Sequence, residues 1–103
     1  MTSPVSPEIE AEITLLSTEC GGRDSAILSG EYRGVLSVGD ENYSARFQVK
    51  NETGFSLSET QIVGVQFLFP DAALPFFPVG ATFAVWEGRN IGHGKVIKRL
   101  KNA

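Results

Sequence analysis

The residue types that most often carry catalysis are scarce in this chain. It has one histidine, His93, between two glycines, and one cysteine, Cys20. A metal site would need further histidine or cysteine ligands at suitable spacing, and neither residue type recurs. We therefore expect no catalytic centre, no metal and no cofactor. An enzyme that uses Cys20, with its thiolate favoured by the nearby Arg23, is the alternative.

Three carboxylates alternate along the first apolar segment of the chain. Glu8, Glu10 and Glu12 would share one face of a strand, because side chains two residues apart point the same way. We interpret them as solvated charges that keep an edge strand from pairing with other chains.

The overall charge argues against a protein that binds nucleic acid mainly through phosphates. The chain has 9 basic and 12 acidic residues, a net charge of −3, whereas phosphate binding depends on a basic surface. Basic residues do collect near the C-terminus, at Lys95, Lys98, Arg99 and Lys101. We interpret them as a solvated strand end, with a small phosphate-facing patch as the alternative.

Alternation of apolar and polar residues indicates β-strands along most of the chain, and no segment has a sustained helical period. Short strands separated by turn residues predict an all-β domain, either a sandwich or a barrel. The expected strands cover residues 9–15, 26–29, 32–38, 43–50, 61–69, 82–86 and 91–100.

The chain length of 103 residues suits one domain. We expect residues 1–8 to form a flexible lead-in, residues 9–100 the domain, and residues 101–103 a tail. No apolar run approaches the ~20 residues needed to cross a bilayer, and the first residues lack the apolar stretch of a secretory signal. A single cysteine cannot form an internal disulfide. These features favour a cytoplasmic domain.

Two of the expected strands have features that the fold must explain. In residues 61–69, Ile62 and Leu68 are apolar although they lie on the otherwise polar face, so this strand should be covered on both faces, by the chain itself or by a second subunit. In the last strand, Gly92 and Gly94 put bare backbone on one face, which indicates a bulge or close strand packing.

Phe76 and Phe77 follow each other in a segment bounded by prolines. Their rings could fold back to cap the domain. Alternatively they could form an exposed apolar patch, which on a small protein tends to mark a partner site.

Two blocks of sequence carry a family resemblance. The first contains Ala-Glu-Ile-Thr-Leu-Leu at 11–16, Glu-Cys-Gly-Gly-Arg at 19–23 and Ser-Gly-Glu-Tyr-Arg at 29–33. The second is Phe-Ala-Val-Trp-Glu-Gly-Arg-Asn-Ile-Gly-His-Gly-Lys-Val at 83–96. In this order and at this separation, they resemble the opening and the close of the C-terminal β-barrel domain of translation elongation factor Tu.

The resemblance implies a closed antiparallel barrel of about six strands. In the family this domain follows a GTPase domain and another barrel, binds the T stem of aminoacyl-tRNA, and contacts the nucleotide-exchange factor. It has no GTPase activity of its own, so we expect this chain to bind no nucleotide.

The resemblance also names candidate RNA contacts. The family's Glu-Gly in the last hairpin contacts tRNA, and Glu87 and Gly88 match it, in a turn that is one residue shorter. Arg89 and Lys95, in the same hairpin and its basic strand, complete this candidate set.

At three other positions the chain departs from the family. A Pro-Gln pair becomes Gly34-Val35, which removes the glutamine, and Glu31 is inserted before Tyr32. A lysine that would face phosphate becomes Phe69, before Pro70. These changes argue against the family's RNA contact.

The hypothesis favoured by the sequence is a non-catalytic interaction domain that binds an unknown protein partner, with Phe69, Phe76 and Phe77 as candidate contacts. A translation accessory protein that binds tRNA or the ribosome through the last hairpin and the basic strand is the alternative. A homodimer is a further option for the partner, and no membrane contact is expected.

Overall fold

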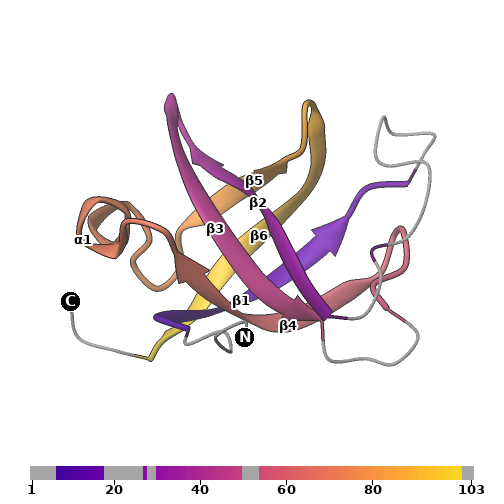
Figure 1. The fold of residues 1–103 in the computed structure, drawn as a ribbon, viewed down its shortest axis with the longest axis horizontal. Coiled ribbons are helices and arrows are strands. Elements are labelled where there is room, and N and C mark those ends of the chain that lie inside the picture. Colours follow the sequence, from indigo (N-terminus) through magenta and orange to yellow (C-terminus); the bar gives the residue numbers. More distant parts are fainter. Residues whose placement is uncertain (1–6, 18–26, 28–29, 50–53, 101–103) are drawn as a thin grey trace.

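Six antiparallel strands form a closed barrel in the computed structural model, which describes residues 7–17, 27, 30–49 and 54–100 (Figure 1). The order around the barrel is β1-β4-β3-β2-β5-β6, and β6 pairs with β1 to close it. This confirms the predicted fold class. The strands are β1 (Ile9–Leu15), β2 (Gly30–Val38), β3 (Glu41–Val49), β4 (Thr60–Phe67), β5 (Thr82–Trp86) and β6 (Asn90–Arg99).

The core follows directly from the alternation of apolar residues. In β1, for example, Ile9, Ala11, Ile13 and Leu15 are all buried, because period two sends every second side chain into the barrel. Of the short strand expected over 26–29, only Ile27 lies in the described residues. It forms an isolated antiparallel bridge with Phe55.

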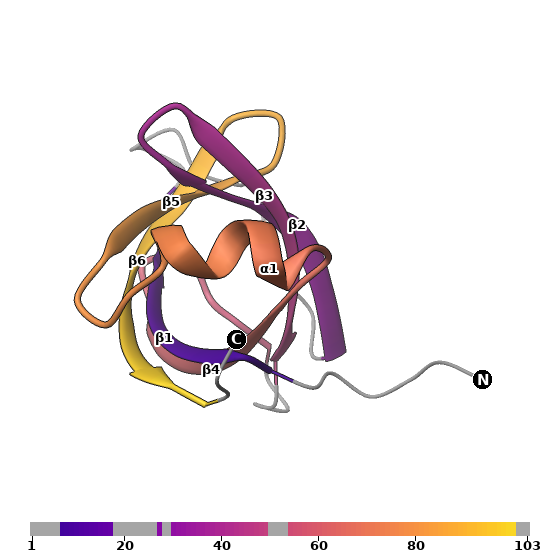
Figure 2. The same cartoon turned by 90° about the vertical axis from the view of Figure 1, so that its left-hand side faces the viewer.

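A helical linker closes one end of the barrel. It consists of α1 (Pro70–Ala73) and the 3₁₀ turn η2 (Leu74–Phe76), and Figure 2 shows it lying across the barrel end. Pro70 stands in the first helical turn, where its missing N–H costs nothing. No helical period marks this linker in the sequence, because α1 and η2 have only four and three residues.

Phe77 lies in the core, so the suggestion that it belongs to an exposed contact surface is wrong. Its ring is fully buried and lies 4.7 Å from that of Phe67, 5.7 Å from that of Phe83 and 5.9 Å from that of Tyr43. Phe76 differs from its neighbour: it is 44% exposed and stacks on Tyr43 at 5.7 Å.

Close packing at Gly92 and Gly94 is confirmed. A Cβ atom on Gly94 would lie 2.5 Å from the Phe83 ring and 2.8 Å from the carbonyl oxygen of Glu12. A Cβ atom on Gly92 would lie 2.7 Å from the carbonyl oxygen of Thr14. A bulge between Val85 and Trp86 adjoins this region.

β1 is not an edge strand, so the interpretation of its glutamates as edge protection is wrong. It pairs with β4 on one side and β6 on the other, and closing a barrel leaves no edge to protect. Glu8 also departs from the expected flexible lead-in: it is buried, and its carboxylate accepts the N–H of Phe67 at 2.8 Å.

The described part of the chain covers the outer face of β4 only in part: Pro7 lies against Gly64, and much of the rest of the face is exposed. β4 ends at Phe67, and Ile62 and Leu68 are 60% and 65% exposed. No helix in the described part of the chain is long and apolar enough to cross a membrane.

Candidate binding groove

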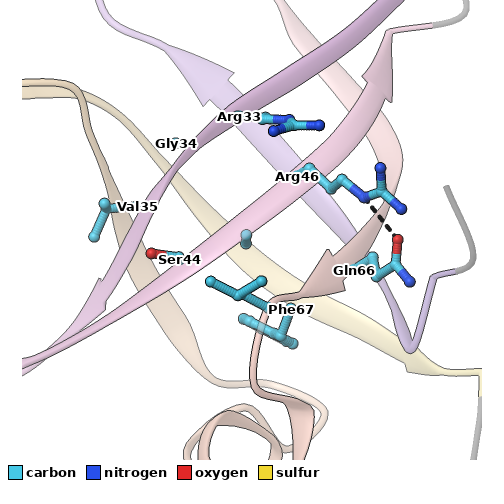
Figure 3. A pocket seen from close by; sticks show the side chains of 9 residues that line it. Arg33, Gly34, Val35, Ser44, Arg46, Gln66 and Phe67 are labelled. Atoms are coloured by element: carbon cyan, nitrogen blue, oxygen red, sulfur yellow. Dashed lines mark hydrogen bonds between the residues drawn. The ribbon is translucent and has the colours of Figure 1, made fainter. Parts of the chain in front are cut away.

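A groove of about 580 Å³ runs over the outer face of β2, β3 and β4 (Figure 3). Six of its lining residues occupy outward positions of the three strands or follow β4: Arg33, Val35, Ser44, Arg46, Gln66 and Leu68. Gly34 and the buried Ala45 and Phe67 complete the lining.

One row of the groove is polar and cationic. Arg33 of β2 stands opposite Arg46 of β3, and Arg46 stands opposite Gln66 of β4. Two like charges directly opposite each other destabilise a sheet. Glu31 relieves this repulsion because its carboxylate binds Arg33 Nε at 2.5 Å and Arg46 Nη1 at 2.7 Å. Arg46 Nε also donates to Gln66 Oε1 at 2.8 Å.

The arginine pair should lower the pKa measured for the Glu31 carboxyl group. The hydrogen bond from Arg33, helped by the charges of Arg33 and Arg46, lowers the pKa of Glu31 below the ordinary value of 4.5, although partial burial opposes the shift. A lowered folded-state pKa means that the carboxylate contributes stability above its unfolded pKa and loses it as the pH falls through the lowered value. We expect NMR titration of the Glu31 carboxyl to show a midpoint below 4.5. Arg33→Gln should move it upward, and an unchanged midpoint in that variant would contradict the assignment.

A second row of the groove is apolar. Val35 is paired with Trp86 of β5 on one side and with Ser44 of β3 on the other. The N–H of Leu68 donates to the carbonyl oxygen of Ser44 at 2.9 Å. Trp86 is 46% exposed, Leu68 65%, and the next residue, Phe69, 68%. This row therefore runs from β5 across β2 and β3 to Leu68, the residue after β4, and Phe69 continues it to the start of the helical linker.

Three of the four candidate RNA contacts lie together in the turn between β5 and β6. Gly88 has a φ of 72°, which favours glycine, and the N–H of Glu87 donates to the carbonyl oxygen of Arg89 at 2.8 Å. The Glu87 carboxylate accepts a hydrogen bond of 2.7 Å from the Tyr32 hydroxyl. Gly34 leaves room for that tyrosine, because a Cβ atom at Gly34 would lie 2.8 Å from its ring.

The fourth candidate, Lys95, does not join this turn. It lies on the outer face of β6, five residues beyond Asn90, which corresponds to roughly 17 Å along a strand. Its cross-strand partner in β1 is Glu12, and that of Lys98 is Glu10. The basic strand thus faces an acidic one, which favours the interpretation of these lysines as a solvated, charge-balanced surface.

Three positions singled out in the sequence lie in or beside the groove. Val35 lines it, Phe69 follows the lining residue Leu68, and Glu31 bridges its arginines. Val35 also pairs with Trp86, the residue before the β5–β6 turn.

The arginine pair and Trp86 were not among the candidate binding residues predicted from the sequence. A two-residue turn at Gly39 and Asp40 fixes the register of β2 against β3, with Val38 opposite Glu41. Counting back from that turn places Arg33 opposite Arg46. The turn signal was therefore enough to find the pair. The neighbourhood of Trp86 depends on the non-local pairing of β2 with β5, which no local signal contains.

Of the residues first considered for catalysis, only His93 lies in the described part of the chain. His93 is exposed on β6, between Thr14 of β1 and Ala84 of β5. Cys20 lies outside the described residues. Within residues 7–17, 27, 30–49 and 54–100, no three His, Cys, Asp or Glu side chains are grouped so that they could hold a metal ion.

The fold and the groove define a small closed six-stranded antiparallel β-barrel with a surface site that is cationic on one side and apolar on the other. No model of a known protein family matches this chain, and no curated protein sequence matches it either.

Proposed function

We propose that this chain is a non-catalytic cytoplasmic interaction domain that binds a partner protein through the groove and the adjoining start of the helical linker. One observation carries the proposal: exposed Leu68 lines the groove, and exposed Phe69 and Trp86 are the chain neighbour of Leu68 and the strand partner of Val35. Exposed apolar side chains next to a concave site, with polar groups beside them, are typical of partner surfaces.

The charge balance and the resemblance support a protein as the partner. A net charge of −3 repels a polyanion. In the family that the chain resembles, the positions of Val35 and Phe69 carry a glutamine and a lysine, so apolar side chains stand here where that family presents polar ones. An elongation-factor-Tu-like barrel in which a protein contact has replaced an RNA contact would account for the negative net charge and for the apolar residues at these two positions.

A translation accessory protein that binds tRNA or the ribosome is the second candidate. It is favoured by the β5–β6 turn with Glu87, Gly88 and Arg89, which follows Trp86, the strand partner of Val35, and by the exposed side chain of Arg33 two residues before Val35. In this case the association should weaken steeply with salt, because phosphate contacts release counterions.

The two candidates are separated by capture on the immobilised full chain from a native lysate, with captured proteins and nucleic acids analysed together. We expect a protein that survives nuclease and moderate salt and is lost when Leu68→Ser and Phe69→Ser are combined. Ile62→Ser is the matched control. Like Leu68 and Phe69, Ile62 is an exposed apolar residue, but it lies within β4 and outside the groove lining. Capture of tRNA or ribosomes that disappears with salt would favour the second candidate.

A second copy of the chain could also cover the groove. Sedimentation of the purified protein tests this arrangement. A dimer that the Leu68→Ser, Phe69→Ser variant dissociates would make the partner another copy of the chain, whereas a monomer leaves the groove for a different protein.

A further inference from the structure

The chemistry of the groove points to its occupant. We propose that it recognises a segment of a partner protein in which an acidic side chain stands next to a bulky apolar one. The carboxylate would bind the arginine pair, and the apolar side chain would pack on Val35 and Leu68. This inference rests on the proposed function and specifies the partner of the same site.

The arginine pair has donors to offer. Arg33 uses Nε for Glu31, and Arg46 uses Nε for Gln66 and Nη1 for Glu31. Among the described residues, no hydrogen bond engages the two terminal amino groups of Arg33 or Nη2 of Arg46. The side chain of Arg33 is 73% exposed, whereas those of Arg46 and Glu31 are only 22% and 20% exposed.

The difference in exposure between Arg33 and Arg46 suits the binding of one carboxylate. Arg46 and Glu31 are held in place by their mutual ion pair and by Gln66, and they form the fixed part of the cluster. Two guanidinium groups share one carboxylate, so the cluster keeps a net positive charge. A planar guanidinium with free terminal nitrogens binds a carboxylate through two parallel hydrogen bonds, which are among the stronger ones in proteins.

The apolar row lies at a distance that one short segment can span. Arg33 and Val35 are two residues apart on the same face of β2, which corresponds to roughly 7 Å. An acidic and an apolar side chain two residues apart in an extended segment have the same separation. Residues three or four apart on a helix, at about 5–6 Å, come close to it.

A phosphate backbone fits this site less well than a carboxylate. Affinity for nucleic acid grows with the number of phosphates that cations neutralise, and the arginine pair with Glu31 keeps a net charge that suits one anionic group rather than a row of phosphates. The apolar side chains of the row from Trp86 to Leu68 carry no charge that could bind the phosphates of a ribose–phosphate chain. The same row would bury an apolar side chain at about 25 cal/mol per Å² of surface removed from water.

The inference is tested by panning a random twelve-residue peptide library, displayed on phage, against the intact full chain. We expect the enriched peptides to contain Asp or Glu close to Phe, Leu or Trp. A synthetic copy of the most enriched peptide then serves as the probe in fluorescence anisotropy. Thermal unfolding of each variant establishes that the barrel is intact.

Three substitutions make the test specific to the groove. Arg33→Gln should weaken binding of the peptide by about tenfold or more, as expected for the loss of a charge-assisted hydrogen-bonded pair. Glu31→Gln should strengthen binding, because it removes the competing internal carboxylate. Lys95→Gln, an exposed cation on β6 that faces Glu12, should leave the affinity within about twofold, in the range of an exposed charge.

Three results would overturn the inference: enrichment of peptides without acidic residues, no enrichment at all, or equal effects of Arg33→Gln and Lys95→Gln. Tighter binding of an RNA stem-loop than of any enriched peptide would overturn it as well. The proposed function would survive these results if the captured partner were still lost from the Leu68→Ser, Phe69→Ser variant. If that variant kept its partner, the proposed function itself would fail.

Discussion

Phe77→Ala should lower the free energy of unfolding by about 3–5 kcal/mol, the range for removing a buried phenylalanine side chain. Phe77 is fully buried and contacts the rings of Tyr43, Phe67 and Phe83. Its loss would leave a cavity under the linker that closes the barrel. Chemical denaturation measured by tryptophan fluorescence is the direct check.

Phe76→Ala is the matched control, because it removes the same side chain one residue earlier. Phe76 is 44% exposed and has one stacked partner, Tyr43, so the expected loss is only about 0.5–1.5 kcal/mol. Equal losses for the two variants would contradict the distinction between a core residue and a surface residue. If Phe77→Ala does not fold, Phe77→Leu should fold with a smaller loss, because less volume is removed.

Gly94→Ala is expected to destabilise the barrel by about 1–3 kcal/mol, the usual cost of forcing extra volume into a packed core. The added methyl group would lie 2.5 Å from the Phe83 ring and 2.8 Å from the carbonyl oxygen of Glu12. One of these contacts is with backbone, so the strands themselves must move. Thermal unfolding measures the effect, since 1 kcal/mol corresponds to roughly 4–8 °C in a domain of this size.

A control and a partial rescue sharpen this prediction. His93→Ala changes the exposed neighbour in the same strand and should cost less than about 0.5 kcal/mol. Phe83→Leu shortens the side chain that the new methyl group meets, so the double variant should be more stable than the sum of the two single losses predicts. A neutral Gly94→Ala would show that Phe83 and β1 are less tightly packed than described.

The local sequence could not decide which of the two adjacent phenylalanines, Phe76 or Phe77, is buried. Both residues are apolar and lie in one proline-bounded segment, so the local sequence treats them alike. Their different fates depend on the turns of α1 and η2, which send one ring into the barrel and leave the other against Tyr43. Helices of three or four residues are too short for a hydrophobic period to reveal them.

The glutamates of β1 give a second example. The alternation around Ile13 correctly predicted a strand with one buried face. It could not say whether that strand lies at an edge, because edges are created or abolished by pairings between distant segments. The closure of β6 on β1 decided this point and placed Lys95 and Lys98 opposite acidic residues instead of in a free basic patch.

The sequence alone determined most of the strands and the all-β class, and it indicated a bulge or close packing at Gly94, because period-two alternation and the lack of a side chain are local properties. The scarcity of His and Cys was also plain from composition. Tertiary structure decided the site: the groove needs β2, β3 and β4 side by side, with Trp86 brought in from β5. These contacts join residues far apart in the chain, and only the closed barrel sets their order.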